Sequence, residues 1–468
     1  LIEDNIDVNE EKKFNFIFSC DKDDIFELEV LLKNYNYLLA EKKLIYSKIL
    51  EENNFVSNIE FLDNLFKIAV LNLYKSIVHF NGEKVFIAGY PWFTQLWGRD
   101  ALLSISLYPL DDEACKGTLK TLAKYKLDNG KIPNYLVLNG NIDYNSSDAT
   151  PLFPIALYSY IKKFGNVALA LDLKETLYSI FEFYKRNKSE DGFVYSERYS
   201  TWMDTLEREG YCIEVQILWQ KALEILSNFF EIFEDDESVK EAKQLAKLLK
   251  SNILKKFSKG KYFCDRLGSD IETINPLFSF VFGFSERKEM LNYIEENFET
   301  NVGLSTINKN SIHYKPNSYH LGCTWSYILA LLSYAQFKKM RVEKALENLR
   351  KIYIKTQEHA LNCIPEVWDS ENGSLYVDKP IGIEISSLIQ TWSAAAVLRA
   401  IDELLGLEVD VLKNIIKISP KIEGNFRRTL RIGEDIVELE IIFKDAKVET
   451  FYRSKLNKVY KIIALPEV

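Results

Sequence analysis

Apolar residues recur with the period of an α-helix in twelve successive segments between residues 59 and 405. Each such segment has an apolar face that must be buried against a neighbour, so the pattern favours an all-α core. The predicted helices are 59–79, 99–108, 112–127, 148–163, 167–187, 213–232, 237–256, 276–283, 285–298, 319–337, 341–358 and 384–405.

The connections between these predicted helices alternate between short and long. The short ones include "FGN" and "KKMR", whereas the long ones are rich in Gly, Pro, Asn and aromatic residues. Helical hairpins that alternate in this way place every long loop at one end of a ring of helices, where loops on a rigid scaffold commonly carry function. We therefore expect an (α/α)6 barrel whose active face collects six long loops. A helical solenoid also accommodates twelve helices, but it does not require the alternation.

Two flanking regions differ from the helical part. Residues 13–19 are predicted to form a strand and residues near 24–52 a polar helix, while residues 411–468 alternate as short strands do. The predicted organisation is an N-terminal strand and helix segment at 1–58, a helical domain at 59–408 and a small β-rich appendage at 409–468. Because the chain begins at Leu1 rather than Met, we interpret the first segment as the remnant of, or linker from, a truncated β domain.

Charge and cysteine content exclude several classes of function. The net charge of −9 argues against binding to nucleic acid or to an anionic membrane, and no apolar run is long enough to span a bilayer. The six Cys residues form no CxxC pair, which predicts free thiols in a reducing, cytoplasmic location. The sequence has no HExxH motif and no glycine-rich phosphate loop, so we expect neither a metal nor an organic cofactor.

The stretch "AGYPWFTQLWGRDALLSI" at residues 88–105 holds two of the seven Trp residues of the chain. Aromatic rings cover the apolar face of a sugar, and an Arg–Asp pair binds neighbouring hydroxyls through charge-assisted hydrogen bonds. Trp92, Trp97, Arg99 and Asp100 are therefore predicted to form the floor and clamp of a sugar subsite. The alternative is that the Trp residues fill the core and that Arg99 and Asp100 are a helix N-terminal charge pair.

Two carboxylates in the long loops are catalytic candidates. Asp204 ends "TWMD" and Glu366 lies in "IPEVWD", each beside a Trp on the same predicted face. Glycosidic hydrolysis uses one protonated carboxyl group as acid and a second carboxylate that activates water or attacks the sugar. A neighbouring aromatic wall raises a carboxyl pKa and so keeps the acid protonated. Other loop carboxylates are interpreted as rim residues: Glu207, Glu209, Asp369 and Glu371.

The chain resembles the amylo-α-1,6-glucosidase (glycogen-debranching) family, which is related to the glucoamylases. The likeness rests on "AGYPWFTQLWGRD", "YNSSDATPLF", "TWMD", "IEVQILWQKAL", "YHLGCTW", "IPEVWD" and "IQTWSAAAVLRA", in family order over residues 59–405. The resemblance implies an (α/α)6 barrel that cleaves a terminal α-glucosyl residue with inversion, with Asp204 as general acid and Glu366 as general base. Further candidate substrate-binding residues in these motifs are Asp148, Trp202, Glu214, Tyr319, His320, Trp325, Trp368 and Gln390.

Two points qualify the assignment of these residues. Asp148 also suits the N-cap of a helix, a position that Asp favours. The sequence departs from the family pattern at Gln95–Leu96, at the short "TLEREGY" segment, at Gln216 in place of Asn and at Leu321 in place of Gln. These positions are expected in subsite walls, so linkage and chain-length preference stay open.

The leading hypothesis is an exo-acting α-glucosidase that removes α-1,6 branch stubs from glycogen, limit dextrin or malto-oligosaccharide. The alternatives are an (α/α)6 glucosidase of α-1,4 or trehalose-like specificity and a glucan-binding homologue without turnover. A prenyl-transfer or cyclase barrel would need Asp-rich or Cys/His metal motifs, which the sequence lacks. Oligomeric state is left open. If the fold is a ring with one active face, then Trp97, Asp148, Asp204, Tyr319 and Glu366 should line a single pocket.

Overall fold

The computed structural model describes residues 25–137, 140–358, 362–377 and 386–466. Contacts divide the chain into residues 1–51 and a second unit, residues 52–468. Helix α1 (Ile25–Glu52) agrees with the helix predicted near 24–52. The predicted strand at 13–19 lies outside the described residues.

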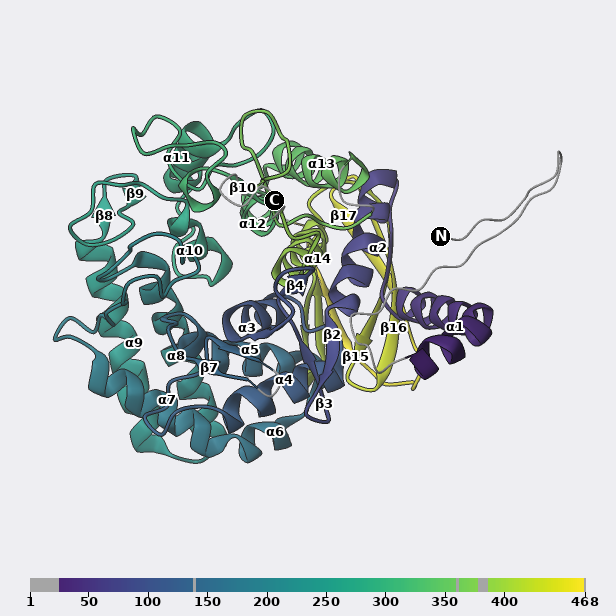
Figure 1. The fold of residues 1–468 in the computed structure, drawn as a ribbon, viewed down its shortest axis with the longest axis horizontal. Helices are drawn as coiled ribbons and strands as arrows, with labels where there is room; N and C mark the ends of the chain where they lie inside the picture. Colours follow the sequence, from purple (N-terminus) through teal and green to yellow (C-terminus); the bar gives the residue numbers. More distant parts are fainter. Residues whose placement is uncertain (1–24, 138–139, 359–361, 378–385, 467–468) are drawn as a thin grey trace. The chain divides into compact units, whose positions relative to one another are not determined.

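Six helices of the second unit pack side by side in a closed sequence, as Figure 1 shows. Helix α3 contacts α5, α5 contacts α8, α8 contacts α10, α10 contacts α12, α12 contacts α14, and α14 returns to α3. Their bounds are α3 (Gly98–Leu107), α5 (Ala149–Phe164), α8 (Ile213–Ile232), α10 (Phe278–Val281), α12 (Ser326–Lys338) and α14 (Thr391–Leu404). In α12, residues 326–337 are all buried, as expected for a helix that is apolar on every side.

The other helices of this unit follow or precede the ring helices in the chain and have a single apolar face. In α9 (Asp236–Lys256), for example, the buried residues Ala242, Ala246, Leu249 and Ile253 form one stripe at helical spacing, and the helix packs on α8. The remaining helices are α2 (Glu60–Lys75), α4 (Asp112–Lys124), α6 (Val167–Asp172), α7 (Lys174–Asn187), α11 (Lys288–Phe298) and α13 (Val342–Glu358).

The C-terminal strands form two small sheets. Strands β1 (Asn54–Val56), β15 (Gly424–Ile432), β16 (Asp435–Lys444) and β17 (Lys447–Ser454) pair antiparallel in that order. The second sheet contains β13 (Glu408–Asp410), β14 (Ile415–Ile418) and β18 (Lys461–Ala464). Buried Arg428 of β15 donates to Asp402 of α14 at 2.8 Å and to the Tyr108 hydroxyl at 2.6 Å, which ties the larger sheet to the ring. The fold is thus helix-rich with a small C-terminal strand region.

Several long connections end in two-residue strands that pair with one another. Strand β4 (Gly89–Tyr90) pairs with β12 (Ile389–Gln390), β5 (Leu96–Trp97) with β6 (Tyr135–Leu136), and β10 (Thr324–Trp325) with β11 (Val367–Trp368). Shorter elements complete the description: β2 (Ile77–Phe80), β3 (Glu83–Phe86), β7 (Ile142–Asp143), β8 (Ser258–Lys259), β9 (Tyr262–Phe263), η1 (Asn275–Leu277), η2 (Tyr319–Leu321) and η3 (Val411–Lys413).

The glycines of "AGYPWFTQLWG" are needed for these pairings. A Cβ atom at Gly89 would collide with the carbonyl oxygen of Ile389, and one at Gly98 with that of Pro133. Gly98 also donates its N–H to the carbonyl of Asn134 at 2.7 Å. The two glycines therefore let neighbouring loops approach closely where α3 begins.

Several predicted helix segments need correction at their ends or interior, among them 276–283, of which only 278–281 form an α-helix, and 285–298, which begins at Lys288. Helix α12 begins only at Ser326, and the predicted residues before it contain η2 and β10. The backbone there is not helical: Tyr319 has a φ of +47°, and Gly322 lies so close to the Lys315 carbonyl that a Cβ atom would collide with it. The last ring helix begins at Thr391 rather than 384, α2 ends at Lys75, and the segment 167–187 divides into α6 and α7. Residues 384–385 lie outside the described part.

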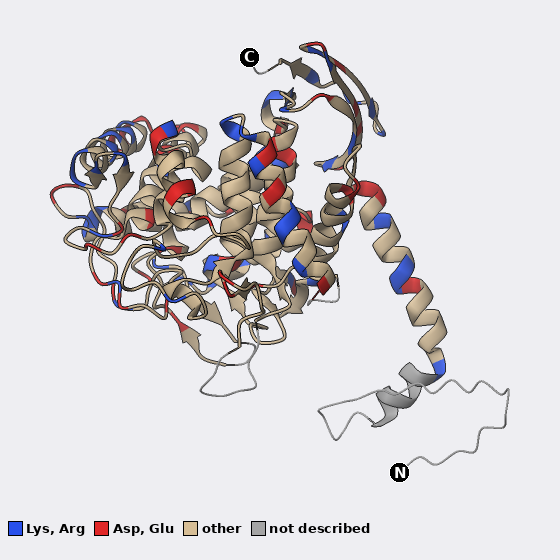
Figure 2. Cartoon of the chain, turned by 90° about the horizontal axis from the view of Figure 1, so that it is seen from above, with Lys and Arg blue, Asp and Glu red and all other residues tan. Residues whose placement is uncertain are grey.

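Lys and Arg residues are interspersed with Asp and Glu over the described helices and strands (Figure 2). Within the described residues, no helix has both the length and the apolar character that crossing a membrane requires.

Candidate active site

A pocket lies where several ring helices begin. Arg99 and Asp100 belong to the first turn of α3, Trp325 is the N-cap residue of α12, and Gln390 is the N-cap residue of α14. The pocket is lined by Ala88, Phe93, Trp97, Arg99, Asp100, Trp202, Asp204, Tyr319, His320, Trp325, Glu366, Gln390 and Trp392. Most of the residues selected from the sequence are thus brought together, although they come from segments far apart in the chain.

Arg99 connects two carboxylates of the site. Its Nε donates to Asp148 Oδ2 at 2.7 Å and its Nη1 to Asp204 Oδ2 at 3.3 Å, while Nη2 reaches the carbonyl of Ser200 at 3.4 Å. Arg99 thus forms its ion pairs with Asp148 and Asp204. Burial raises the pKa of Asp100 to about 8 against the effect of Arg99, and its carboxyl group accepts no hydrogen bond from the described side chains. Asp100 keeps its hydrogen-bonding capacity for a ligand.

Asp148 lies behind Arg99 and does not line the pocket. It occupies the N-cap position of α5 without a capping hydrogen bond. Instead Asp148 Oδ1 accepts from Ser146 Oγ at 2.6 Å, and Ser146 Oγ accepts from the backbone N–H of Ala149 at 3.0 Å. Ser146 therefore satisfies the helix end, and Asp148 is left to hold the guanidinium.

Glu366 is buried and fully hydrogen-bonded. Its position follows from β11, which begins at the next residue and pairs with β10, and from the hydrogen bond between Ser326 N and Glu366 O at 3.0 Å. Tyr319 Oη donates to Oε1 at 2.6 Å and the backbone N–H of Ser387 donates to Oε2 at 3.2 Å. Burial raises the pKa of Glu366 to about 7, and these hydrogen bonds oppose the rise.

Asp204 is more open to solvent than Glu366, with 35% of its side chain exposed. It follows Trp202 and Met203 in a tight turn, where Leu206 N donates to Met203 O at 3.0 Å. Burial raises its pKa, and the charge of Arg99 opposes the rise. Two carboxyl groups with different surroundings thus open into one pocket, although the separation of 6.5–9.5 Å that inversion requires stays a prediction.

Aromatic rings form the wall of the pocket. Trp202 makes edge-to-face contacts with His320 and Trp325, and His320 stacks on Trp325 at 4.7 Å between centroids. Burial lowers the pKa of His320 well below its usual range, so the imidazole is neutral. Trp325 Nε1 and Trp392 Nε1 are buried without a hydrogen-bond partner among the described residues. Apolar faces combined with unpaired donors suit a ligand rich in hydroxyl groups.

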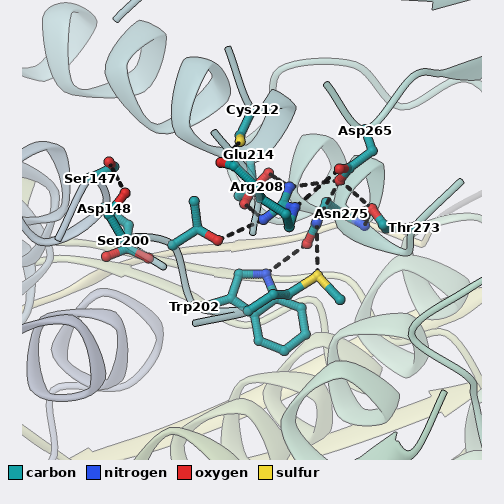
Figure 3. Close-up of polar contacts among 12 residues, drawn as sticks. Ser147, Asp148, Ser200, Trp202, Arg208, Cys212, Glu214, Asp265, Thr273 and Asn275 are labelled. Carbon is teal, nitrogen blue, oxygen red and sulfur yellow. Dashed lines mark hydrogen bonds and ion pairs between the residues drawn. The ribbon is translucent and has the colours of Figure 1, made fainter. Parts of the chain in front are cut away.

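Besides Asp148, three predicted substrate-binding residues do not line this pocket. Trp92 is 37% exposed. Trp368 is buried, and its Nε1 donates to the carbonyl of Val302 at 3.1 Å. Glu214 is fully buried in the first turn of α8, where both its oxygens accept from Arg208 at 2.6 and 2.9 Å (Figure 3). Glu214 and Trp368 are thus bound to other parts of the protein and lie outside the pocket lining, and their contact with substrate stays a prediction.

The sequence analysis also missed residues of the site. Phe93 and Trp392 line the pocket, and each lies inside a motif that had been singled out, so their aromatic character beside Trp92 and Gln390 was the available signal. Arg208 carried no such signal, because it belongs to none of the motifs and its partner Asp265 comes from a loop some fifty residues away. Among the described residues, no group of three or more His, Cys, Asp or Glu side chains is placed to hold a metal ion.

Comparison of the sequence with models of known protein families identifies the family of this chain. The family model for amylo-alpha-1,6-glucosidase matches residues 54–399, which include every residue of the pocket. The chain belongs to the amylo-alpha-1,6-glucosidase family. No curated protein matches the chain.

Several solved structures of similar fold are glycosidases. A family GH78 rhamnosidase of Bacillus sp. GL1 superposes with a TM-score of 0.69 at 13% identity, covering 89% of this chain and 43% of that one. An α-L-rhamnosidase from Dictyoglomus thermophilum gives 0.62 at 12% identity, covering 85% and 44%. A glycosidase variant in complex with glucose gives 0.57 at 14% identity, covering 73% and 97%. This chain thus spans less than half of the two rhamnosidases, and at such identities the likeness concerns the fold.

Proposed function

We propose that this member of the family is an exo-acting α-glucosidase that hydrolyses α-1,6-linked glucosyl branch stubs of glycogen-like α-glucan with inversion. The observation that carries the proposal is the pocket in which Asp204 and Glu366 face a common aromatic wall. In this proposal the closed set of ring helices, with α2, α4, α7, α9, α11 and α13 outside it, is an (α/α)6 barrel. The proposed organisation of the chain is an N-terminal segment at residues 1–58, the catalytic domain at 59–408 and the β appendage at 409–468.

The proposed mechanism uses the two carboxyl groups alone. Asp204 donates a proton to the leaving glycosidic oxygen, and Glu366 removes a proton from the attacking water. Asp100 and Arg99 hold hydroxyls of the terminal sugar, and Trp97, Trp202 and Trp325 cover its apolar face. Tyr319 and the Ser387 N–H orient Glu366, because each binds one of its oxygens. Asp148 holds Arg99 in place from behind.

A specific observation favours exchanged roles as the alternative. The pKa of Glu366 is raised to about 7, whereas Arg99 lies beside Asp204 and favours its ionised form. Against the exchange, both oxygens of Glu366 accept hydrogen bonds from donors that favour a carboxylate. Asp204 is also the more exposed of the two, as suits a group that must reach a leaving oxygen.

Substrate and stereochemistry can be tested in one experiment. The purified protein is incubated with a branched limit dextrin, maltose and trehalose, and released glucose is followed by anomer-resolved NMR. Release of β-glucose from the dextrin is expected. Preferred release from maltose or trehalose would instead establish the α-1,4 or trehalose-like alternative. Binding of the dextrin without release of glucose would indicate a glucan-binding homologue.

A cytoplasmic location is part of the proposal. Within the described residues, Cys115, Cys212, Cys264 and Cys323 are buried free thiols. Free thiols are typical of a reducing compartment.

The pH dependence should follow the ionisation of Glu366. Because the base must be ionised, kcat/KM for α-glucosyl fluoride, whose leaving group needs no proton, should rise with pH and level off above about pH 7. The measurement is an initial-rate pH profile at low substrate concentration. If the fluoride profile lacks this rise and activity on the glucan instead falls above about pH 7, Glu366 is the proton donor.

Replacing Asp148 with Asn should weaken the hold on Arg99. The variant removes the charge that faces Arg99 Nε at 2.7 Å, so we expect kcat/KM on limit dextrin to fall about tenfold or more. Asp111→Ala is the matched control: it removes the side chain that caps α4 by accepting from Ala114 N at 2.9 Å, and it should lower stability by about 1 kcal/mol with little effect on kcat. Normal kinetics for Asp148→Asn in a folded protein would contradict the assigned role.

A further inference from the structure

A buried ion network lies next to the pocket without lining it. Its centre is Arg208, which is 5% exposed and donates to both oxygens of Glu214 at 2.6 and 2.9 Å. The same guanidinium donates to Asp265 through Nη2 at 2.6 Å and through Nε at 3.1 Å. Figure 3 shows these side chains converging from the loop before α8, from α8 itself and from the loop after β9. Arg208 is thus bound on two sides by carboxylates from separate elements.

This network holds the segment that carries Asp204 on both sides of that residue. Before Asp204, Thr201 Oγ1 accepts from Arg208 Nη1 at 2.7 Å. Trp202 Nε1 donates to Asn275 Oδ1 at 2.7 Å, and Asn275 Nδ2 donates to Asp265 Oδ1 at 2.9 Å. After Asp204, the segment ends at Arg208 itself. Residues 201–208 are therefore tied at both ends to the same three ionised groups.

Asp204 itself has little that fixes its position. Its carboxylate has one ion pair, with Arg99 Nη1 at 3.3 Å, and its side chain is 35% exposed. The placement of this carboxyl group therefore depends on the backbone of the turn. The Arg208 network binds that turn through Thr201 and Trp202. A displacement of a reacting group by about 1 Å can reduce a rate about 100-fold.

The energetics of the network also favour a positioning role. Burying one guanidinium and two carboxylates carries a large desolvation cost, which the ion pairs mainly offset, so such networks contribute little net stability. Burial raises the pKa of Glu214 against the effect of Arg208, whereas Arg208, Thr273 and Asn275 together keep the pKa of Asp265 lowered despite burial. What such a network supplies is one fixed geometry for the segments that it joins.

We propose that Arg208 is a positioning residue, which with Glu214 and Asp265 fixes the turn that presents Asp204 to the pocket. The inference rests on the proposed function, in which Asp204 donates the proton to the leaving group. It assigns Glu214 to the support of the catalytic turn instead of to the substrate. A positioning role predicts a loss of proton donation without a comparable loss of sugar binding.

The test compares two substrates in the full-length chain. For Arg208→Met, kcat on limit dextrin should fall about 100-fold with little change in KM, whereas kcat on α-glucosyl fluoride should fall less than about tenfold. Arg208→Lys should recover part of the loss, because an ammonium group keeps the positive charge but lacks the planar fork that binds a carboxylate through two parallel hydrogen bonds. Arg198→Met is the matched control, since Arg198 forms exposed ion pairs with Glu207 and Glu209 in the same loop, and both substrates should be unaffected.

The outcomes separate this inference from the proposed function. Equal losses on both substrates, or no loss, in a folded Arg208→Met protein would overturn the positioning role. If Arg208→Met does not fold, Thr201→Val decides, because it removes only the acceptor for Arg208 Nη1 and must still show the greater loss on dextrin. Asp204→Asn is assayed in parallel. If Asp204→Asn loses the fluoride activity as well, the assignment of Asp204 as the acid fails. If Asp204→Asn keeps fluoride activity but Arg208→Met loses it, only the positioning role of Arg208 fails.

Discussion

Glu366→Gln should nearly abolish hydrolysis of both limit dextrin and α-glucosyl fluoride, with kcat reduced about 10²- to 10⁴-fold on each. Water must be activated whatever group leaves, and Gln cannot accept a proton in the position held by Tyr319 and Ser387. Steady-state kinetics on the two substrates measure the effect. Near-normal hydrolysis of the fluoride would mean that Glu366 is not the base.

The same variant provides a control for folding through its stability. Because burial raises the pKa of Glu366 from its ordinary 4.5 to about 7, the folded wild-type protein binds a proton more tightly than the unfolded chain. Its free energy of unfolding therefore falls as the pH rises through this window. Glu366→Gln should have a higher Tm than the wild type at pH 8 and a similar Tm at pH 4.5. A lower Tm at pH 8 would show that the site stabilises the carboxylate.

Asp204→Asn should separate the two substrates. Without a proton donor, kcat on limit dextrin should fall about 10²- to 10⁴-fold, whereas α-glucosyl fluoride should keep much more of its activity because fluoride leaves without protonation. Arg99 would still bind the Asn side chain, so sugar binding should be kept.

The reverse pattern would exchange the roles of the two residues. In that case Asp204→Asn would disable both substrates and Glu366→Gln would spare the fluoride. A glucosyl group trapped on either carboxylate, or retention at the anomeric carbon in the NMR assay, would contradict inversion altogether.

The helical part of the fold could be predicted because its signal is local. In α9 the buried Ala242, Ala246, Leu249 and Ile253 recur at the spacing of one helix face, and α8 begins and ends at the predicted residues Ile213 and Ile232. The ends of other helices could not be predicted, because they depend on contacts between distant loops. α12 begins after Trp325 because β10 pairs with β11, some forty residues later.

The candidate site was predicted only in part, for a related reason. Motifs identify residue types near the pocket, but they do not show which side chains turn into it. Glu214 and Trp368 carry the right chemistry and lie in the right motifs, yet one is bound to Arg208 and the other to the carbonyl of Val302. Arg208 meets Glu214 in the first turn of α8 and Asp265 some fifty residues later, and no motif in the sequence signals that the three groups form a network.

The closure of the helix ring has a consequence for how the protein is made. Hydrogen bonds join the first and last long loops beside the pocket. The Ser387 hydroxyl donates to the carbonyl of Tyr90 at 2.6 Å, and the backbone N–H of Thr391 donates to the carbonyl of Ala88 at 2.9 Å. During synthesis, the pocket can therefore form only after α14 has been made. The apolar faces of α2 and α3 are made much earlier and stay exposed until then. Contacts so distant in sequence slow folding and prolong that exposure.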